Sequence, residues 1–143
     1  MKKIGIILLI MAIAALMPVR AVNDSSNGTD NPQVKKSNPV EVYYFHMTRR
    51  CVTCQTVEKV AEDAVKENFK DALAKGTVVF KSVNLEDKAN KDLMKKLKVG
   101  GQSLLVVSGS EKIDITDKGF MYAVNEPDKL KSEIKTHVEK FLK

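Results

Sequence analysis

The chain lacks the residues that most metal sites need. Among its 143 residues it has only two cysteines and two histidines, and no tryptophan. A tight zinc site takes about four ligands, and His46 and His137 stand at no recognisable ligand spacing from the cysteines. Aromatic residues make up only 6% of the chain, and none are interleaved with basic residues in a stripe. We therefore expect no metal site and no binding of nucleic acid.

A nucleotide-binding fingerprint is also missing. The chain has seven glycines, and the only adjacent pair is Gly100 and Gly101. Two glycines alone do not form a phosphate-binding loop, and this pair is better explained as the end of a helix. We therefore expect the chain to carry no flavin or other organic cofactor of its own.

Long apolar runs are absent except near the N-terminus. Residues 1–3 carry two lysines, residues 4–17 are almost entirely apolar, and residues 19–21 read Val-Arg-Ala. This order is typical of a secretory signal peptide, and the apolar run is shorter than the roughly 20 residues of a membrane-spanning helix. We predict a signal peptide over residues 1–21, export to the periplasm, and no stable membrane span after cleavage. An uncleaved anchor remains the alternative.

The rest of the chain divides into a linker and one domain. Residues 22–39 are rich in Asn, Ser, Asp and Pro and have no apolar periodicity, which is typical of a flexible tether. Residues 40–143 contain all the periodic apolar segments and are expected to form a single domain. The net charge of the chain is +6, and three of its positive charges lie in the leader, so the remainder has an ordinary solvated surface.

The feature that the chain does contain is a cysteine pair. Cys51 and Cys54 lie between an apolar stretch, residues 40–45, and a segment whose apolar residues recur at helical spacing. Cysteines three apart at the start of a helix lie on one face. The first is placed where free backbone N–H groups and the helix dipole favour the thiolate, and Arg49 and Arg50 add positive charge beside it. The pair is suited to cycling between dithiol and disulfide.

Two other roles for the pair remain open. An exported protein could hold a purely structural disulfide, in an interaction domain, although so short a loop restricts the unfolded chain little. Alternatively, the two thiolates could capture arsenite or copper(I), soft species that prefer sulfur. The sequence does not fix the direction in which a redox-active pair would work, and it leaves open whether the chain is an enzyme.

The apolar pattern predicts an α/β domain. Strands are expected at residues 40–45, 77–85, 103–107 and 112–116, and helices at residues 52–69, about 87–97 and from Pro127 onward. Residues 117–126 are expected to form a loop whose aromatic residues, Phe120 and Tyr122, close the core; an apolar surface where a partner docks is the alternative. The order β-α-β-α-β-β-α predicts one mixed β-sheet flanked by helices, in three layers.

This order, with a CxxC after the first strand, resembles the thioredoxin fold over residues 40–143. In finer detail, Tyr-Tyr-Phe-His at residues 43–46 and Arg-Arg-Cys-Val-Thr-Cys at residues 49–54, together with residues 114–123, look like the ArsF-type exported proteins. Their family label is nitrophenyl compound nitroreductase subunit. The resemblance implies that Cys51 attacks and Cys54 resolves in exchange with a redox partner protein. It also implies that this chain supplies electrons to a separate catalytic chain or assembles with it.

The sequence departs from the thioredoxin pattern at two places. Thioredoxins carry a cis-proline before the third core strand, facing the cysteines, whereas this chain has Gln102 followed by Ser103. A cis peptide before a non-proline residue costs about 3 kcal/mol, so we expect a trans loop that faces the site with a different shape. The buried acid of thioredoxins also has no counterpart in residues 44–46. His46 is a candidate for proton transfer with Cys54, and a structural or exposed histidine is the alternative.

Overall fold

The computed structural model describes residues 38–143. The predicted signal peptide and residues 22–37 of the predicted linker lie outside the described residues. The elements are β1 (Val40–His46), α1 (Val52–Asn68), α2 (Lys70–Ala74), β2 (Val78–Asn84), the 3₁₀ turn η1 (Lys88–Asn90), α3 (Lys91–Leu97), β3 (Ser103–Ser108), β4 (Glu111–Asp114), α4 (Thr116–Tyr122) and α5 (Pro127–Leu142). The predicted order β-α-β-α-β-β-α is confirmed, with α2 and α4 as additional short helices.

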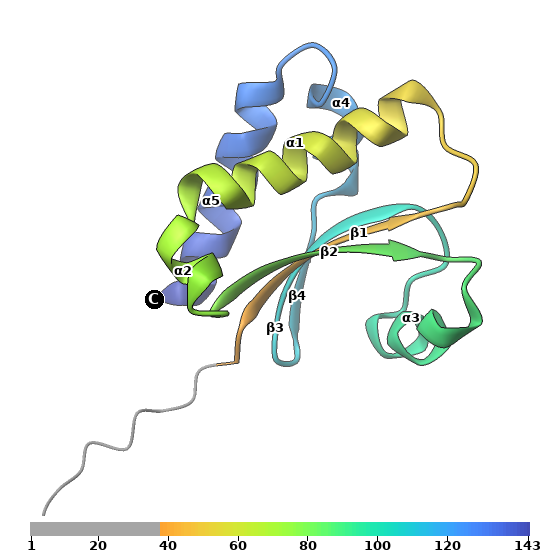
Figure 1. The fold of residues 1–143 in the computed structure, drawn as a ribbon, viewed down its shortest axis with the longest axis horizontal. Helices are drawn as coiled ribbons and strands as arrows, with labels where there is room; N and C mark the ends of the chain where they lie inside the picture. The colour runs from red at the N-terminus through yellow and green to blue at the C-terminus, as the bar shows by residue number, and fades with distance from the viewer. Residues whose placement is uncertain (1–37) are drawn as a thin grey trace, which may run out of the picture. The chain divides into compact units, whose positions relative to one another are not determined.

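The strands form one mixed sheet in the order β2-β1-β3-β4 (Figure 1). β2 runs parallel to β1, with Val40 opposite Val78 and His46 opposite Asn84. β3 runs antiparallel to β1, and β4 runs antiparallel to β3. Parallel neighbours need a crossover connection, and α1 and α2 supply it. β1 therefore lies inside the sheet, and its last residue leads directly to the loop that carries the cysteines.

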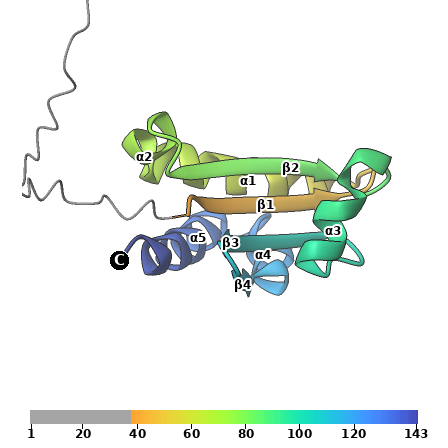
Figure 2. The same ribbon diagram turned by 90° about the horizontal axis from the view of Figure 1, so that it is seen from below.

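Helices cover both faces of the sheet, as the predicted three-layer architecture requires. Figure 1 shows α3 below the strands and α1, α4 and α5 above them, and in the turned view of Figure 2 α3 lies in front of the strands. Alternate side chains of β1 point to opposite faces. Val42 and Tyr44 join the core beneath α1 and α5, whereas Tyr43 and Phe45 join a smaller core beneath α3. Because both faces of β1 are buried, its sequence is almost continuously apolar.

The two long helices owe their positions to apolar stripes. The buried residues of α5 are Leu130, Ile134 and Val138, spaced four apart on one side of the helix. Pro127 occupies the first turn of α5, where a missing N–H costs nothing. α1 buries a longer stripe, which consists of Cys54, Val57, Val60, Ala61, Ala64 and Val65. The second cysteine is thus the first member of the stripe that anchors α1 to the sheet.

The expectation of a loop at residues 117–126 is wrong, because most of this segment forms α4. The backbone N–H and the hydroxyl of Thr116 both donate to Asp114 Oδ1, at 3.0 and 2.6 Å, which ties the first residue of α4 to the last residue of β4. Gly119 then lets the helix approach the core. A Cβ there would lie 3.2 Å from both Leu104 Cδ2 and Val57 Cγ1, closer than most Cβ contacts. The expectation that the aromatic residues close the core is confirmed for Tyr122, which is buried.

The end of α3 also differs from the expectation. We expected Gly100 and Gly101 to stop this helix, but it ends at Leu97. Lys98 adopts a left-handed conformation with φ of 54°, and its N–H bonds to the carbonyls of the preceding turn. This is the C-terminal capping conformation that glycine normally provides. The two glycines follow in the connection to β3, which carries Gln102 toward the cysteines.

Candidate functional site

The cysteine pair lies at the N-terminus of α1, next to the C-terminal end of β1. Cys51 is the N-cap residue, with extended backbone angles of −74° and 167°, and its Sγ accepts a hydrogen bond from the backbone N–H of Cys54 at 3.3 Å. Cys51 is exposed and Cys54 is buried, and both are free thiols. The predicted placement of a close cysteine pair at a helix entrance is therefore confirmed. One sulfur can meet a partner while the other is held one turn inside.

The two thiols experience opposite environments. The pKa of Cys51 is lowered, first by a hydrogen bond from the Cys54 thiol and then by backbone N–H groups at the start of α1. The pKa of Cys54 is raised, first because its proton is engaged by Cys51 and then by burial. The arrangement favours a thiolate at the exposed Cys51 and a protonated thiol at Cys54, which suits Cys51 as a nucleophile.

The arginines before the pair point to different surroundings. Arg50 forms an ion pair with Glu58 of α1, and Glu58 also accepts a hydrogen bond from Ser82 of β2. Arg49 is exposed. Neither arginine is among the causes of the lowered pKa of Cys51. Support of the Cys51 thiolate by these residues stays a prediction. Glu58 was not among the predicted site residues, and its carboxylate neutralises the Arg50 guanidinium.

His46 is buried at the end of β1, with 9% of its surface exposed. Its Nδ1 lies 2.9 Å from the carbonyl oxygen of Met47, so this nitrogen carries the proton and donates. The ring stacks against that of Tyr44, with centroids 6.1 Å apart. These contacts fit the structural alternative, and a part for His46 in proton transfer to Cys54 stays a prediction.

The loop before β3 brings one of its two predicted residues to the sulfurs. The thiol of Cys54 donates to Oε1 of Gln102 at 3.4 Å. The hydroxyl of Ser103 instead donates to the carbonyl of Gly101 at 3.0 Å, within its own loop. Gln102 thus occupies the position beside the pair, whereas Ser103 holds the shape of the loop.

Tyr44 is a further residue of interest, on the face of β1 that α1 covers. Its side chain is fully buried on the α1 face of the sheet. Burial raises its pKa to about 12, and the charge of Cys54 adds to this effect. The alternation of side chains along β1 would have placed Tyr44 on the helix side, but the sequence does not indicate how far its hydroxyl reaches.

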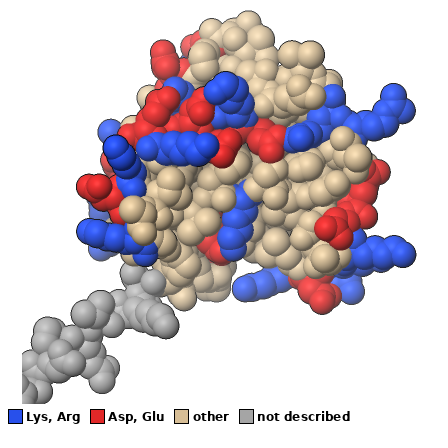
Figure 3. Space-filling view, viewed as in Figure 1, with Lys and Arg blue, Asp and Glu red and all other residues tan. Residues whose placement is uncertain are grey.

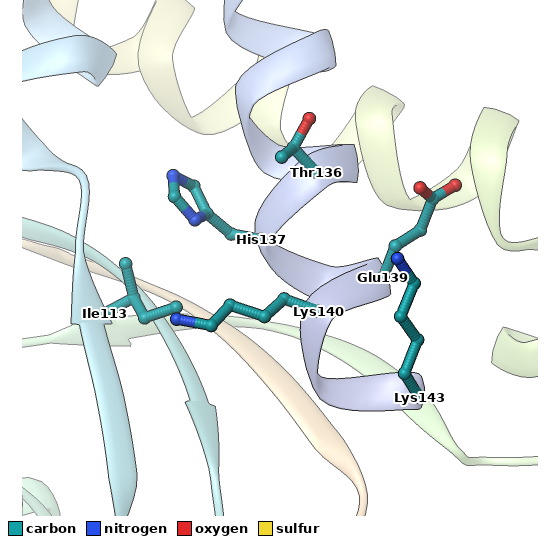
Figure 4. Close-up of a pocket in the computed structure, with 6 residues that line it drawn as sticks. All are labelled: Ile113, Thr136, His137, Glu139, Lys140 and Lys143. Atoms are coloured by element: carbon teal, nitrogen blue, oxygen red, sulfur yellow. The ribbon is translucent and has the colours of Figure 1, made fainter.

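A separate pocket lies far along the chain from the cysteines. It has a volume of about 420 Å³ and is lined by Ile113, Thr136, His137, Glu139, Lys140 and Lys143 (Figure 4). His137 lies 3.6 Å from Glu133, one turn earlier on α5. Most of the side chains that line it come from the last turns of α5, and they do not form a convergent set of catalytic groups.

Charged side chains are interspersed on the face of the domain shown in Figure 3. Several form ion pairs along helices, such as Lys59 with Asp63 and Lys66 with Glu62. Within residues 38–143, no three His, Cys, Asp or Glu side chains are placed to hold a metal ion together. In the same part of the chain, no helix has the length and apolar character needed to cross a membrane.

The lowered pKa of Cys51 predicts rapid alkylation at moderate pH. In the reduced protein, iodoacetamide is expected to modify Cys51 with a half-maximal rate at a lower pH than in the urea-unfolded chain, because folding favours the thiolate. Buried Cys54 should react slowly. Peptide mapping by mass spectrometry, at pH 4–10 in about half-unit steps, separates the two sites.

Two variants test the cause of this shift. Cys54→Ala removes the thiol that donates to Cys51 and is expected to move the Cys51 profile to higher pH, whereas Cys54→Ser keeps an O–H donor and should move it less. If the folded and unfolded proteins gave the same profile for Cys51, the proposed thiolate environment would be wrong.

Comparison of the chain with protein-family models, curated proteins and solved structures gives no match in any of the three. The fold must therefore be judged from its topology. A mixed sheet in the order β2-β1-β3-β4, with β2 parallel to β1 and helices on both faces, places a close cysteine pair at the start of α1. This arrangement is consistent with a thioredoxin-like fold.

Proposed function

We propose that this chain is an exported thioredoxin-like redox protein that exchanges disulfides or electrons with a protein partner through Cys51 and Cys54. The observation that carries the proposal is the contrast between the two thiols. An exposed thiol with a lowered pKa lies within reach of a buried thiol with a raised one. A structural disulfide does not need this difference in exposure and proton affinity.

The chemistry follows from this contrast. In the reducing direction, the Cys51 thiolate attacks one sulfur of a partner disulfide, and the partner's other sulfur leaves as a thiolate. Cys54 then loses its proton and attacks Sγ of Cys51, which breaks the mixed disulfide and forms the Cys51–Cys54 bond. The partner gains two electrons, which the protein loses. Its two sulfurs take up the proton of Cys54 and one proton from solvent, equal to the one that Cys51 released when it ionised. The oxidising direction is the reverse sequence.

The surroundings of Cys51 suit a protein partner. Val52, next to the exposed sulfur, is 78% exposed, and Met47 in the preceding loop is 38% exposed. Exposed apolar side chains beside a reactive thiol offer a surface that a protein partner can contact. The absence of a proline at Gln102 supports a dedicated partner over general peptide binding. By the finer resemblance to ArsF-type proteins, that partner would belong to a reductase system whose catalytic chain is separate.

The redox equilibrium of the purified protein tests this proposal. The protein is equilibrated with graded mixtures of reduced and oxidised glutathione, and Cys51 is followed by alkylation. We expect a reversible two-electron transition at a potential of roughly −100 to −280 mV. The value itself would indicate whether the protein acts as an oxidant or a reductant.

The other roles of the pair predict different results. A disulfide that resists reduction until below about −300 mV would contradict the proposal and favour a structural bridge. A pair that never oxidises would favour capture of a soft ion. In that case, arsenite or copper(I) should raise the melting temperature of the wild-type protein and leave that of Cys51→Ser unchanged.

A further inference from the structure

The hydroxyl of Tyr44 is a buried polar group without a partner. Tyr44 has 0% of its surface exposed. Among the described residues, its hydroxyl oxygen is the one buried side-chain nitrogen or oxygen that makes no hydrogen bond. Leaving such a group unpaired costs about 1–3 kcal/mol, and buried polar groups without partners are rare in folded proteins. A second state of the protein in which the hydroxyl is paired would account for it.

The surroundings of this hydroxyl identify the group that could pair with it. After burial, the charges that act most on the Tyr44 phenol are those of Cys54 and Arg50. Tyr44 also pairs with Leu104 across the sheet, two residues after Gln102, whose side chain contacts the Cys54 sulfur. Tyr44 therefore lies on the α1 face of the sheet, beside the strand that follows the Gln102 loop.

Backbone groups of Cys51 and Cys54 are the donors that stabilise a thiolate at Cys54, and its pKa stays raised in spite of them. Its thiol proton faces an acceptor, the Oε1 of Gln102, at 3.4 Å. When Cys54 loses that proton, a carbonyl oxygen faces a negative sulfur, which is unfavourable in a buried site. The nearby guanidinium of Arg50 is already engaged by Glu58. A further neutral donor near the sulfur would stabilise the buried thiolate, and with a pKa of about 12 the Tyr44 phenol keeps its proton near neutral pH.

We propose that the Tyr44 hydroxyl donates a hydrogen bond to the Cys54 thiolate as it forms in the resolving step. This inference rests on the proposed function. In that step the proton of Cys54 leaves through the opening at Cys51 and ends on the partner thiolate that departs. The Cys54 thiolate forms the new S–S bond, and the bond between Cys51 and the partner breaks. Tyr44 keeps its own proton throughout and acts as a thiolate-stabilising residue.

The test replaces Tyr44 by phenylalanine, which removes the hydroxyl and keeps the ring. The pKa of Cys54 is measured in a Cys51→Ser background by thiolate absorbance at 240 nm. The variant is expected to raise this pKa and to slow resolution of a preformed mixed disulfide by about 10- to 100-fold, the range for a lost hydrogen bond to a charged group. Urea unfolding of the reduced protein should show no loss of stability, because no hydrogen bond is removed.

Tyr43→Phe provides the matched control. Tyr43 is the neighbouring residue of β1 but lies in the core on the α3 side, and its phenol is influenced by Glu41 and Lys81 instead of the cysteines. This variant should leave the Cys54 pKa and the resolution rate unchanged.

The results separate this inference from the proposed function. If Tyr44→Phe leaves the pKa of Cys54 and the resolution rate as in the wild type, the inference is overturned, whatever the change in stability. The Cys54 pKa is measured without any partner or redox cycle. A redox potential typical of a structural disulfide would therefore contradict the proposed function, while a raised Cys54 pKa in Tyr44→Phe would still support the hydrogen bond.

Discussion

Replacement of Cys51 by serine is expected to abolish disulfide exchange. The rate of reduction of a protein disulfide by the reduced chain should fall by more than about 100-fold, because a serine hydroxyl is not ionised near neutral pH and cannot replace a thiolate. Serine can still accept the hydrogen bond from the N–H of Cys54, so α1 should keep its N-cap. The rate is measured by stopped-flow mixing of the reduced chain with a protein whose fluorescence changes when its disulfide is reduced. Folding is checked by circular dichroism.

Cys54→Ser is the companion variant, and it separates attack from resolution. It keeps the exposed nucleophile and lacks the sulfur that releases the partner, so a mixed disulfide through Cys51 should accumulate. Non-reducing electrophoresis detects this species. Exchange at the wild-type rate in Cys51→Ser would contradict the assignment of the nucleophile. A mixed disulfide that formed through Cys54 in that variant would reverse the two roles.

Leu104→Ala is expected to produce the largest loss of stability, about 2–5 kcal/mol in the free energy of unfolding. Leu104 is fully buried in β3, beneath the point where Gly119 brings α4 against the sheet. Its backbone N–H is also held by the hydroxyl of Thr116, at 3.0 Å. These fixed neighbours limit how far the core can collapse into the cavity. Urea denaturation monitored by circular dichroism measures the change.

The matched control for this prediction is Leu142→Ala. Leu142 is the same residue type at the end of α5, with 46% of its surface exposed, so its loss should cost less than about 1 kcal/mol. Equal losses in the two variants would mean that α4 and β3 do not pack as closely as the structure shows.

The fold could be predicted largely from local patterns. The stripe of Leu130, Ile134 and Val138 follows from helical spacing, and the alternation in β1 follows from strand geometry. α4 could not be predicted, because its sequence contains a glycine and polar residues that are usual in loops. It is a helix because Gly119 allows contact with Leu104 and Val57, which come from distant parts of the chain. The end of α3 was missed because a lysine took the conformation expected of glycine.

The candidate site divides in the same way. The position of Cys51 and Cys54 at a helix entrance is a matter of spacing, and the sequence was sufficient to predict it. The sequence also pointed to Gln102 through the place of the loop before β3. The ion pair between Arg50 and Glu58 needs a side chain two turns along α1, and no local pattern indicates it.

The sequence by itself determined the α/β order, the cysteine pair and the apolar faces that bring the helices onto the sheet, because these depend on the periods of helix and strand. Only the tertiary structure decided which polar groups surround the buried thiol. The burial of Cys54 depends on residues that meet across the fold, and the loop before β3 brings Oε1 of Gln102 to 3.4 Å from its sulfur. Burial and the hydrogen bonds at the start of α1 set the proton affinity of each sulfur, and with it the chemistry that the pair can perform.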